Sequence, residues 1–199
     1  SSSSVYGSNT KIPFSEGDVT DSPVSLYAAT KKGGELLAKS YHHLYNIPMV
    51  GLRFFTVYGP WGRPDMAYYS FAKKIMREEP LPLYNHGKME RDFTYIDDIV
   101  DGIIATLDHP EGFEIYNLGN NRPEPLMRLV ELLEKYLGKK AHLTYKPMQK
   151  GDVTSTYADI TKANQAFGYA PKTSLDQGIA QFSSWFLERL SPCLESSPY

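Results

Sequence analysis

Apolar residues occur along the chain in two patterns, short continuous runs and a spacing of three to four positions, and these predict strands and helices, respectively. Short apolar runs such as Met49–Phe55 predict buried strands, and stretches with an apolar residue every three or four positions predict amphipathic helices. The first such stretch extends from Pro23 to about Tyr45, with Ser22 as the expected N-cap. Val5–Gly7 predicts the end of a short strand ahead of it. The order strand, helix, strand is typical of a parallel α/β sheet.

The rest of the chain continues this mixed pattern. Further helices are expected at 68–78, 95–107, 126–136, 160–167 and 175–190, and further strands at 81–84, 114–118 and 141–145. A loop rich in glycine and proline is expected from residue 57 to residue 66.

Composition places the 199 residues among ordinary globular proteins and excludes several classes. Hydrophobic residues make up 41%, charged residues 22%, and the net charge is −2, so we expect no nucleic-acid partner. The single cysteine, Cys193, excludes a disulfide framework and a cysteine metal cluster within this sequence, and we expect no metal site. No apolar run approaches the roughly 20 residues of a membrane helix, and no signal-peptide pattern opens the chain.

Tyr-x-x-x-Lys pairs are the first candidates for acid–base chemistry. In a helix this spacing places the phenol and the ammonium one turn apart on the same face. A tyrosine phenol ordinarily ionises only near pH 10, so a nearby positive charge that favours the phenolate makes it a better base. Four pairs occur, Tyr27/Lys31, Tyr69/Lys73, Tyr84/Lys88 and Tyr136/Lys140, so the spacing alone is weak evidence.

Context distinguishes Tyr27/Lys31 from the other three pairs. It lies early in the first predicted helix and follows the hydroxyl-rich segment Ser1–Ser4. A serine hydroxyl there can donate to an oxygen on which negative charge develops, or relay its proton. The alternative is a surface tyrosine and lysine on an amphipathic helix, and the residues alone leave both interpretations open.

Four segments resemble, in order, the signatures of extended short-chain dehydrogenase/reductases of the NAD-dependent epimerase/dehydratase family. They are Ser2–Gly7 (SSSVYG), Tyr27–Lys31 (YAATK), Arg53–Pro60 (RFFTVYGP) and Arg91–Asp98 (RDFTYIDD). The resemblance extends to about Leu190 and is closest to UDP-glucuronate 4-epimerases. Thr56 stands where UDP-galactose 4-epimerases usually carry asparagine, and residues 59–67 are similar to the glucuronate-epimerase loop.

This resemblance implies an α/β fold: the C-terminal half of a Rossmann-type parallel sheet plus a small mixed α/β substrate-binding lobe. Residues 1–60 would be a partial NAD-binding region, and 61–199 mainly the nucleotide-sugar lobe, with about 91–120 returning to the Rossmann sheet. Neither Gly-x-Gly-x-x-Gly nor Gly-x-x-Gly-x-x-Gly occurs in the sequence. We therefore expect the family's glycine-rich NAD-binding part to be absent from these residues.

The implied activity is NAD-linked 4-epimerisation. Tyr27 would remove the proton of the sugar 4-hydroxyl while hydride moves from C4 to NAD, and hydride would return to the opposite face of the 4-keto sugar. Ser2, 25 residues before Tyr27, would be the hydroxyl partner of the phenol. Lys31 would bind the nicotinamide ribose, and Phe55 would lie with Tyr27 and Lys31 at the cofactor.

The implied substrate is a UDP-sugar, closest to UDP-glucuronate converted to UDP-galacturonate. The resemblance assigns to it Ser3, Ser4, Thr56, Arg63, Tyr84, Arg91, Gln149 and Asp152. The fork of Arg63 would pair with the sugar carboxylate, the alternatives being a solvated arginine or a pair with Asp65. Arg91 would hold phosphate, unless it pairs with a neighbouring acid. Tyr84 would cover uracil, unless it is a core aromatic.

Other interpretations stay open. A UDP-galactose 4-epimerase or a dehydratase belongs to the same superfamily, although a dehydratase needs a carboxylate pair where Ser3 and Ser4 stand. The lack of a glycine-rich turn also fits a nucleotide-sugar-binding fragment without catalysis. We further expect a cytoplasmic homodimer, in which Gly33 and Gly34 let the first helix pack closely against another helix.

Overall fold

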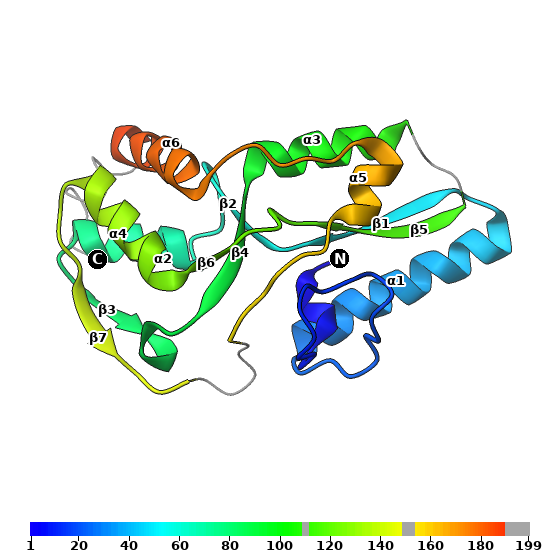
Figure 1. The fold of residues 1–199 in the computed structure, drawn as a ribbon, viewed down its shortest axis with the longest axis horizontal. Helices are drawn as coiled ribbons and strands as arrows, with labels where there is room; N and C mark the ends of the chain where they lie inside the picture. The colour runs from blue at the N-terminus through cyan, green and yellow to red at the C-terminus, as the bar shows by residue number, and fades with distance from the viewer. Residues whose placement is uncertain (109–111, 149–153, 190–199) are drawn as a thin grey trace. The chain divides into compact units, whose positions relative to one another are not determined.

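The computed structural model describes residues 1–108, 112–148 and 154–189, which fold into two compact units (Figure 1). The first unit comprises the described residues of 1–57, 91–123 and 155–172. The second comprises those of 58–90, 124–154 and 173–189.

A parallel pair of strands forms the centre of the first unit. β1 (Met49–Phe54) and β5 (Phe113–Leu118) pair from Met49 opposite Phe113 to Phe54 opposite Leu118. Ser2 forms a parallel bridge with Phe54, the last residue of β1. The serine-rich segment therefore lies at the carboxyl end of this pair, where ligands bind in open parallel sheets. The expectation of a parallel α/β fold is confirmed.

Alternation along β1 directs its side chains to two different layers. Leu52 and Phe54 pack in a cluster with Ile99 and Leu118, which involves α3 (Ile96–Leu107) and α5 (Thr161–Phe167). Arg53 lies between them in sequence and reaches α1 (Leu26–Tyr45). Accordingly, α1 and α3 lie on opposite faces of the β1–β5 pair (Figure 1).

The start of α1 differs from the prediction. Ser25, not Ser22, is the N-cap, because its hydroxyl accepts the N–H of Ala28 at 3.1 Å. Both serines precede the amphipathic pattern, and the pattern does not say which of them is the last extended residue. The helix ends as predicted before Asn46, which adopts left-handed backbone angles.

The strand predicted at Val5–Gly7 is wrong. η1 (Ser3–Tyr6) is a short 3₁₀ helix. Within the described segment Ser1–Gly7, the one residue that bridges to β1 is Ser2. The Ser2 hydroxyl accepts the Ser4 N–H at 3.2 Å. Serine side chains that bond to nearby backbone offer the chain an alternative to a strand ladder, and here that alternative is formed.

The second unit combines three helices with its own parallel pair. β3 (Pro80–Leu83) pairs with β7 (His142–Tyr145). α4 (Leu126–Leu137) packs against both α2 (Ala67–Met76) and α6 (Leu175–Arg189). Its most buried aromatic side chains are Tyr58, Tyr68, Phe182 and Phe186.

Four short elements complete the order. They are β2 (Thr56–Tyr58), η2 (Tyr84–Gly87), β4 (Glu90–Tyr95) and β6 (Pro123–Pro125). β2, β4 and β6 form a sheet in the order β2-β4-β6. β2, β4 and β6 were not predicted: β2 includes the first two residues of the loop expected at 57–66, β4 shows no simple apolar run, and β6 begins and ends with proline.

Candidate active site

Ser2, Tyr27 and Lys31 come from two adjoining elements of the first unit. η1, capped by Ser2, packs against α1, which carries Tyr27 and Lys31 in its first two turns. The Lys31 ammonium nitrogen lies 5.5 Å from the centroid of the Tyr27 ring. Tyr27 is 48% exposed, so its phenol is accessible to a ligand rather than packed in the core. The structure thus brings together the elements that bear the predicted catalytic residues.

The other three Tyr-x-x-x-Lys pairs have different surroundings, and all lie in the second unit. The ring of Tyr69 packs edge-on against Phe186. Tyr84 begins η2, whose next two residues have left-handed backbone angles, so helical spacing does not apply there. Tyr136 donates a 2.5 Å hydrogen bond to Asp176. Position on a helix beside the serine segment therefore distinguishes Tyr27 from the others.

The neighbouring predicted ligand residues differ in their accessibility. The hydroxyl of Ser4 is buried and, among the described residues, has no hydrogen-bond partner. A buried hydroxyl left unpaired is costly, but this oxygen has almost no accessible surface, so the substrate role of Ser4 stays a prediction. Thr56 and Ser3 are half-buried. Phe55 is only 5% exposed, and its ring packs in the core cluster that contains Val5 and Tyr6.

A buried ion pair joins α1 to β1 beneath these residues. The Glu35 carboxylate accepts from Arg53 Nε at 2.8 Å and from Arg53 Nη2 at 2.9 Å. It also accepts from the Ser1 hydroxyl at 2.7 Å. Burial opposes the negative charge, but hydrogen bonds from Arg53 and Ser1 and the charges of Arg53 and Lys32 outweigh it. They lower the pKa of Glu35 to about 2.

Two further polar side chains extend this pair across the unit. Arg53 Nη1 donates to the Tyr6 hydroxyl at 3.1 Å, and that hydroxyl donates to Asn117 Oδ1 at 2.6 Å. Asn117 Nδ2 donates in turn to the Phe14 carbonyl at 2.9 Å. Burial raises the pKa of Tyr6 to about 12, even though Arg53 acts in the opposite direction. Sequence reasoning missed this network, although an arginine inside an apolar run was a signal for it.

Asp92, beside Arg91 on β4, is a second buried acid. Its carboxylate is fully buried and accepts the backbone N–H groups of Asn120 at 2.6 Å, Ala158 at 2.8 Å and Asn121 at 3.2 Å. Burial raises its pKa to about 6, against the effect of these hydrogen bonds. Asp92 therefore fixes the backbone around β4, where Arg91 is half-buried and its phosphate role stays a prediction.

The remaining predicted substrate residues are elsewhere. Arg63 belongs to the second unit, is exposed, and pairs through Nε and Nη2 with both carboxylate oxygens of Asp65. Tyr84 is half-buried in the same unit, with the Lys146 ammonium 6.0 Å from its ring centroid. Gln149 and Asp152 lie outside the described residues.

A family comparison gives this arrangement its context. A model described as the NAD dependent epimerase/dehydratase family matches residues 1–119, more than half of the chain. The chain belongs to the NAD-dependent epimerase/dehydratase family. The resemblance inferred from the four motifs is thereby confirmed.

Relatives of this epimerase/dehydratase chain include named enzymes. An uncharacterized protein of Methanocaldococcus jannaschii is 57% identical over 188 residues, which cover 94% of this chain and 58% of that protein. UDP-glucuronate 4-epimerase 4 of Arabidopsis thaliana is 49% identical over 208 residues, covering 96% and 48%, respectively. UDP-glucuronic acid 4-epimerase from Bacillus cereus, in complex with UDP-glucuronic acid and NAD, matches with a TM-score of 0.88 and 37% identity, covering 94% and 60%. The chain thus spans about half to three-fifths of these relatives' lengths.

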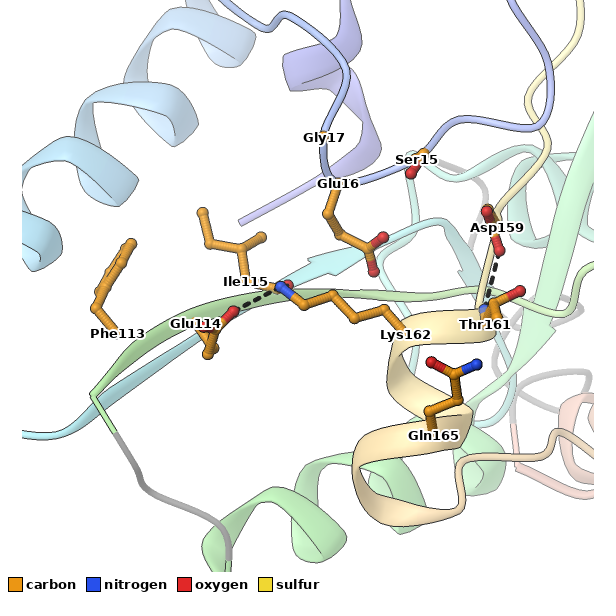
Figure 2. A pocket seen from close by; sticks show the side chains of 10 residues that line it. All are labelled: Ser15, Glu16, Gly17, Phe113, Glu114, Ile115, Asp159, Thr161, Lys162 and Gln165. Atoms are coloured by element: carbon orange, nitrogen blue, oxygen red, sulfur yellow. Dashed lines mark hydrogen bonds and ion pairs between the residues drawn. The ribbon is translucent and has the colours of Figure 1, made fainter.

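A separate cavity of about 470 Å³ lies along β5 in the first unit of this family member (Figure 2). The side chain of Lys162 extends from α5 along β5, with its nitrogen 2.6 Å from Glu114 Oε2. Glu16 lies on the other wall and accepts the Asn117 N–H at 2.7 Å. None of the predicted site residues lines this cavity, so it is distinct from the candidate active site.

The described residues contain no group of three His, Cys, Asp or Glu side chains placed to hold a metal ion. Among the helices of 1–108, 112–148 and 154–189, none combines the length and apolar character needed to cross a membrane.

Proposed function

We propose that the full-length protein is an NAD-dependent UDP-sugar 4-epimerase that interconverts UDP-glucuronate and UDP-galacturonate. The observation that carries the proposal is the accessible Tyr27 with Lys31 beside it, on a helix packed against the serine segment at the carboxyl end of β1. Identity of 49% to a UDP-glucuronate 4-epimerase supports this choice of substrate. The cytoplasmic location stays a prediction.

Each catalytic side chain has a distinct task in this proposal. Tyr27 takes the proton from the sugar 4-hydroxyl and later returns a proton to the same oxygen. The ammonium of Lys31, 5.5 Å from the centroid of the Tyr27 ring, binds the nicotinamide ribose beside the phenol. The hydroxyl of Ser2 donates to the sugar oxygen while negative charge develops on it. We keep Ser3 and Ser4 as predicted substrate residues beside Ser2, although the Ser4 hydroxyl is buried.

The residues present fit the nicotinamide end of NAD. Tyr27 and Lys31 present donors near the carboxyl end of a parallel strand pair, and the exposed phenol leaves room for a ligand. When bound, NAD supplies a reversible hydride acceptor for the sugar C4. We assign residues 1–60 and about 91–120 to the NAD-binding region and the remainder mainly to the nucleotide-sugar lobe. We also assign Phe55 to the cofactor region. Because its ring is buried, its proposed contribution is to support the backbone beside the cofactor rather than to contact the cofactor through the ring.

Product analysis tests the proposed activity. The full-length protein, incubated with NAD and UDP-glucuronate, should form UDP-galacturonate, detected by the changed coupling at the sugar C4 proton in NMR spectra. Interconversion of UDP-glucose and UDP-galactose without this product would contradict the substrate assignment. A 4-keto-6-deoxy sugar product from a nucleotide hexose would indicate a dehydratase. Binding of UDP-glucuronate without turnover would indicate a non-catalytic binding protein.

Removal of the Arg63 guanidinium tests the recognition of the substrate carboxylate. Arg63→Ala should weaken binding of UDP-glucuronate about 10- to 100-fold, since a hydrogen bond to a charged group contributes roughly 1.5–3 kcal/mol. The affinity for UDP-glucose, which lacks the carboxylate, should change little. In the structure Asp65 occupies the fork of Arg63, so the substrate carboxylate must exchange with it.

Isothermal titration calorimetry with both nucleotide sugars gives the two dissociation constants. Arg128→Ala is the control, because Arg128 is also an arginine of the second unit that pairs with acids, Glu131 and Asp176. An equal loss of affinity for both sugars in Arg63→Ala would remove the carboxylate role.

We also propose that the full-length protein is a homodimer that pairs through α1. The face of α1 opposite Glu35 carries exposed apolar side chains, including Leu37 at 64%, Tyr41 at 53% and Leu44 at 67%. A side-chain carbon added at Gly33 or Gly34 on this face would meet no atom within 4 Å. Exposed apolar faces of this kind mark interaction sites, and an isologous dimer would pair this face with itself.

Charge placed on this face should separate the subunits. Leu37→Glu combined with Leu44→Glu would place two carboxylates of each subunit against those of the other subunit in the proposed interface. Burying these like charges is unfavourable, so we expect a monomer in sedimentation velocity at micromolar concentration. Lys39→Glu changes an exposed side chain on another face of the same helix and should leave the dimer intact. A double variant that sediments as a dimer would show that α1 is not the interface.

A further inference from the structure

The catalytic groups of the proposed function sit on two different elements, and their mutual placement needs a cause. Ser2 caps η1, a 3₁₀ helix of four residues, whereas Tyr27 and Lys31 stand at the start of the 20-residue helix α1. A segment as short as η1 has few hydrogen bonds of its own to fix its position. Other contacts must therefore hold the serine hydroxyl at a defined place beside the phenol.

Glu35 makes contacts that bind the two elements together. It stands on the buried face of α1, one turn after Lys31 and two turns after Tyr27, with only 6% of its surface exposed. One carboxylate oxygen accepts from the hydroxyl of Ser1, the residue before Ser2, and both oxygens accept from Arg53. The same carboxylate thus anchors α1 and the start of the serine segment.

Arg53 and Tyr6 hold the other end of η1. Arg53 is 2% exposed, and its guanidinium carbon lies 4.9 Å from the centroid of the Tyr6 ring while Nη1 donates to the Tyr6 hydroxyl. Tyr6 is the last residue of η1, and its hydroxyl is also bound to Asn117 on β5. The short helix is therefore tied at both ends to one ion pair.

We propose that Glu35, Arg53 and Tyr6 are positioning residues that fix the distance and orientation between the Ser2 hydroxyl and the Tyr27–Lys31 pair. This inference rests on the proposed function for its kinetic consequence. A buried ion pair often contributes little net stability compared with apolar side chains of similar volume, so stability alone does not explain these three residues. A fixed geometry does, because small displacements of catalytic groups have large effects on rate.

Two matched tyrosine variants of the full-length protein distinguish positioning from simple stabilisation. Tyr6→Phe removes the hydroxyl that links Arg53 to Asn117. Tyr169→Phe removes a similarly buried hydroxyl of the same unit, which donates to the Gly119 carbonyl at 3.1 Å; Tyr169 belongs to the core cluster of Ile99 and Leu118. Tyr6→Phe should lower kcat for UDP-glucuronate epimerisation about 10- to 100-fold with KM nearly unchanged. Tyr169→Phe should leave kcat within about twofold.

Amide hydrogen exchange provides a readout that does not depend on the reaction. Tyr6→Phe should speed exchange at the Ser4, Val5 and Gly7 amides selectively, whereas Tyr169→Phe should not. Equal kcat in the two variants, in an active wild type, would overturn the positioning role. Unchanged exchange in η1 would overturn it as well. A wild type without epimerase activity would refute the proposed function, and the exchange experiment would still test the network.

A second set of variants guards against a Tyr6→Phe protein that does not fold. Glu35→Gln keeps the size and the acceptor oxygen of the side chain but removes the charge, and Arg53→Lys keeps the charge but loses the planar fork. Both should lower kcat about 10-fold or more with little change in KM if geometry is what the network supplies. Wild-type kcat in either variant would contradict the proposal.

Discussion

Tyr27→Phe in the full-length protein is expected to lower kcat for epimerisation of UDP-glucuronate by about a thousandfold, within the range for general acid–base catalysis. The substitution removes one oxygen atom and leaves the ring. Because Tyr27 is about half exposed and belongs to neither the Val5–Tyr6 cluster nor the Ile99–Leu118 cluster of the described residues, the fold should be unaffected. Phenylalanine cannot accept or donate the proton of the sugar 4-hydroxyl, so the loss should appear in kcat.

The dissociation constant for UDP-glucuronate and the melting temperature should stay close to those of the wild type. Tyr136→Phe is the matched control, since Tyr136 also precedes a lysine by four residues but lies in the second unit and donates to Asp176. Its kcat should equal that of the wild type. A Tyr27→Phe protein that retains more than about a tenth of the wild-type kcat would exclude Tyr27 as the proton-transfer residue.

Strong periodicity made most of the elements predictable from sequence. The helices α1, α2, α3, α4, α5 and α6 and the strands β1, β3, β5 and β7 were all expected, with ends displaced by at most three residues. The failures have local causes. η1 forms because Ser2 caps it, and β6 is too short and too rich in proline to show an apolar pattern. The formation of a 3₁₀ helix at η1 in place of a strand depends on a side-chain hydrogen bond rather than on hydrophobic spacing.

In the candidate site, contacts between residues close in sequence could be predicted, whereas contacts between distant residues could not. Tyr27 and Lys31 are on one helix, so their four-residue spacing is enough to place them together. Glu35 and Arg53 are 18 residues apart, and Asp92 and Ala158 are 66 apart. The first contact requires the packing of helix α1 on strand β1, and the second requires a distant non-helical segment to lie against β4, neither of which a local motif encodes. The signal for such contacts in the sequence is a charged residue inside a segment that is predicted to be buried, such as Arg53 in the apolar run Met49–Phe55.

Arg63 illustrates a case in which the sequence offered two partners. The resemblance assigns it to a substrate carboxylate, and the neighbouring Asp65 was the alternative. In the structure, the Asp65 carboxylate accepts hydrogen bonds from both Nε and Nη2 of Arg63. The two interpretations are compatible, because an exposed ion pair of this kind is weak and exchangeable. Its partner in the complex stays a prediction.

Arg53→Ala is the substitution with the largest expected effect on stability. It removes the guanidinium that pairs with Glu35 and leaves this buried carboxylate with the Ser1 hydroxyl and the partly exposed Lys32 ammonium, 3.3 Å away, as its remaining partners. Breaking a buried ion pair in this way destabilises proteins by about 3–5 kcal/mol. The free energy of unfolding of the full-length protein, measured by urea denaturation, should fall by this amount at neutral pH. A loss below about 1 kcal/mol, typical of exposed pairs, would contradict the burial argument.

Two controls separate the unpaired charge from the lost packing. Arg128→Ala breaks an exposed pair with Asp176 and should cost less than about 1 kcal/mol. Arg53→Met combined with Glu35→Leu removes both charges and refills the volume with apolar atoms. This double variant should recover much of the stability lost in Arg53→Ala, since the buried charge is the main cost.

The pH dependence of stability provides an independent test of the same pair. Burial opposes the negative charge of Glu35, but the hydrogen bonds from Arg53 and Ser1 and the charges of Arg53 and Lys32 outweigh it and lower its pKa to about 2 from an ordinary value of 4.5. A depressed folded-state pKa stabilises the fold above the unfolded pKa, so this contribution of about 3 kcal/mol is complete above pH 5. It is lost as the pH falls towards 2, with about 2 kcal/mol gone by pH 3. Glu35→Gln cannot titrate, so its unfolding free energy should fall less steeply between pH 5 and pH 3. Identical slopes for wild type and variant would show that Glu35 is not held as a buried carboxylate.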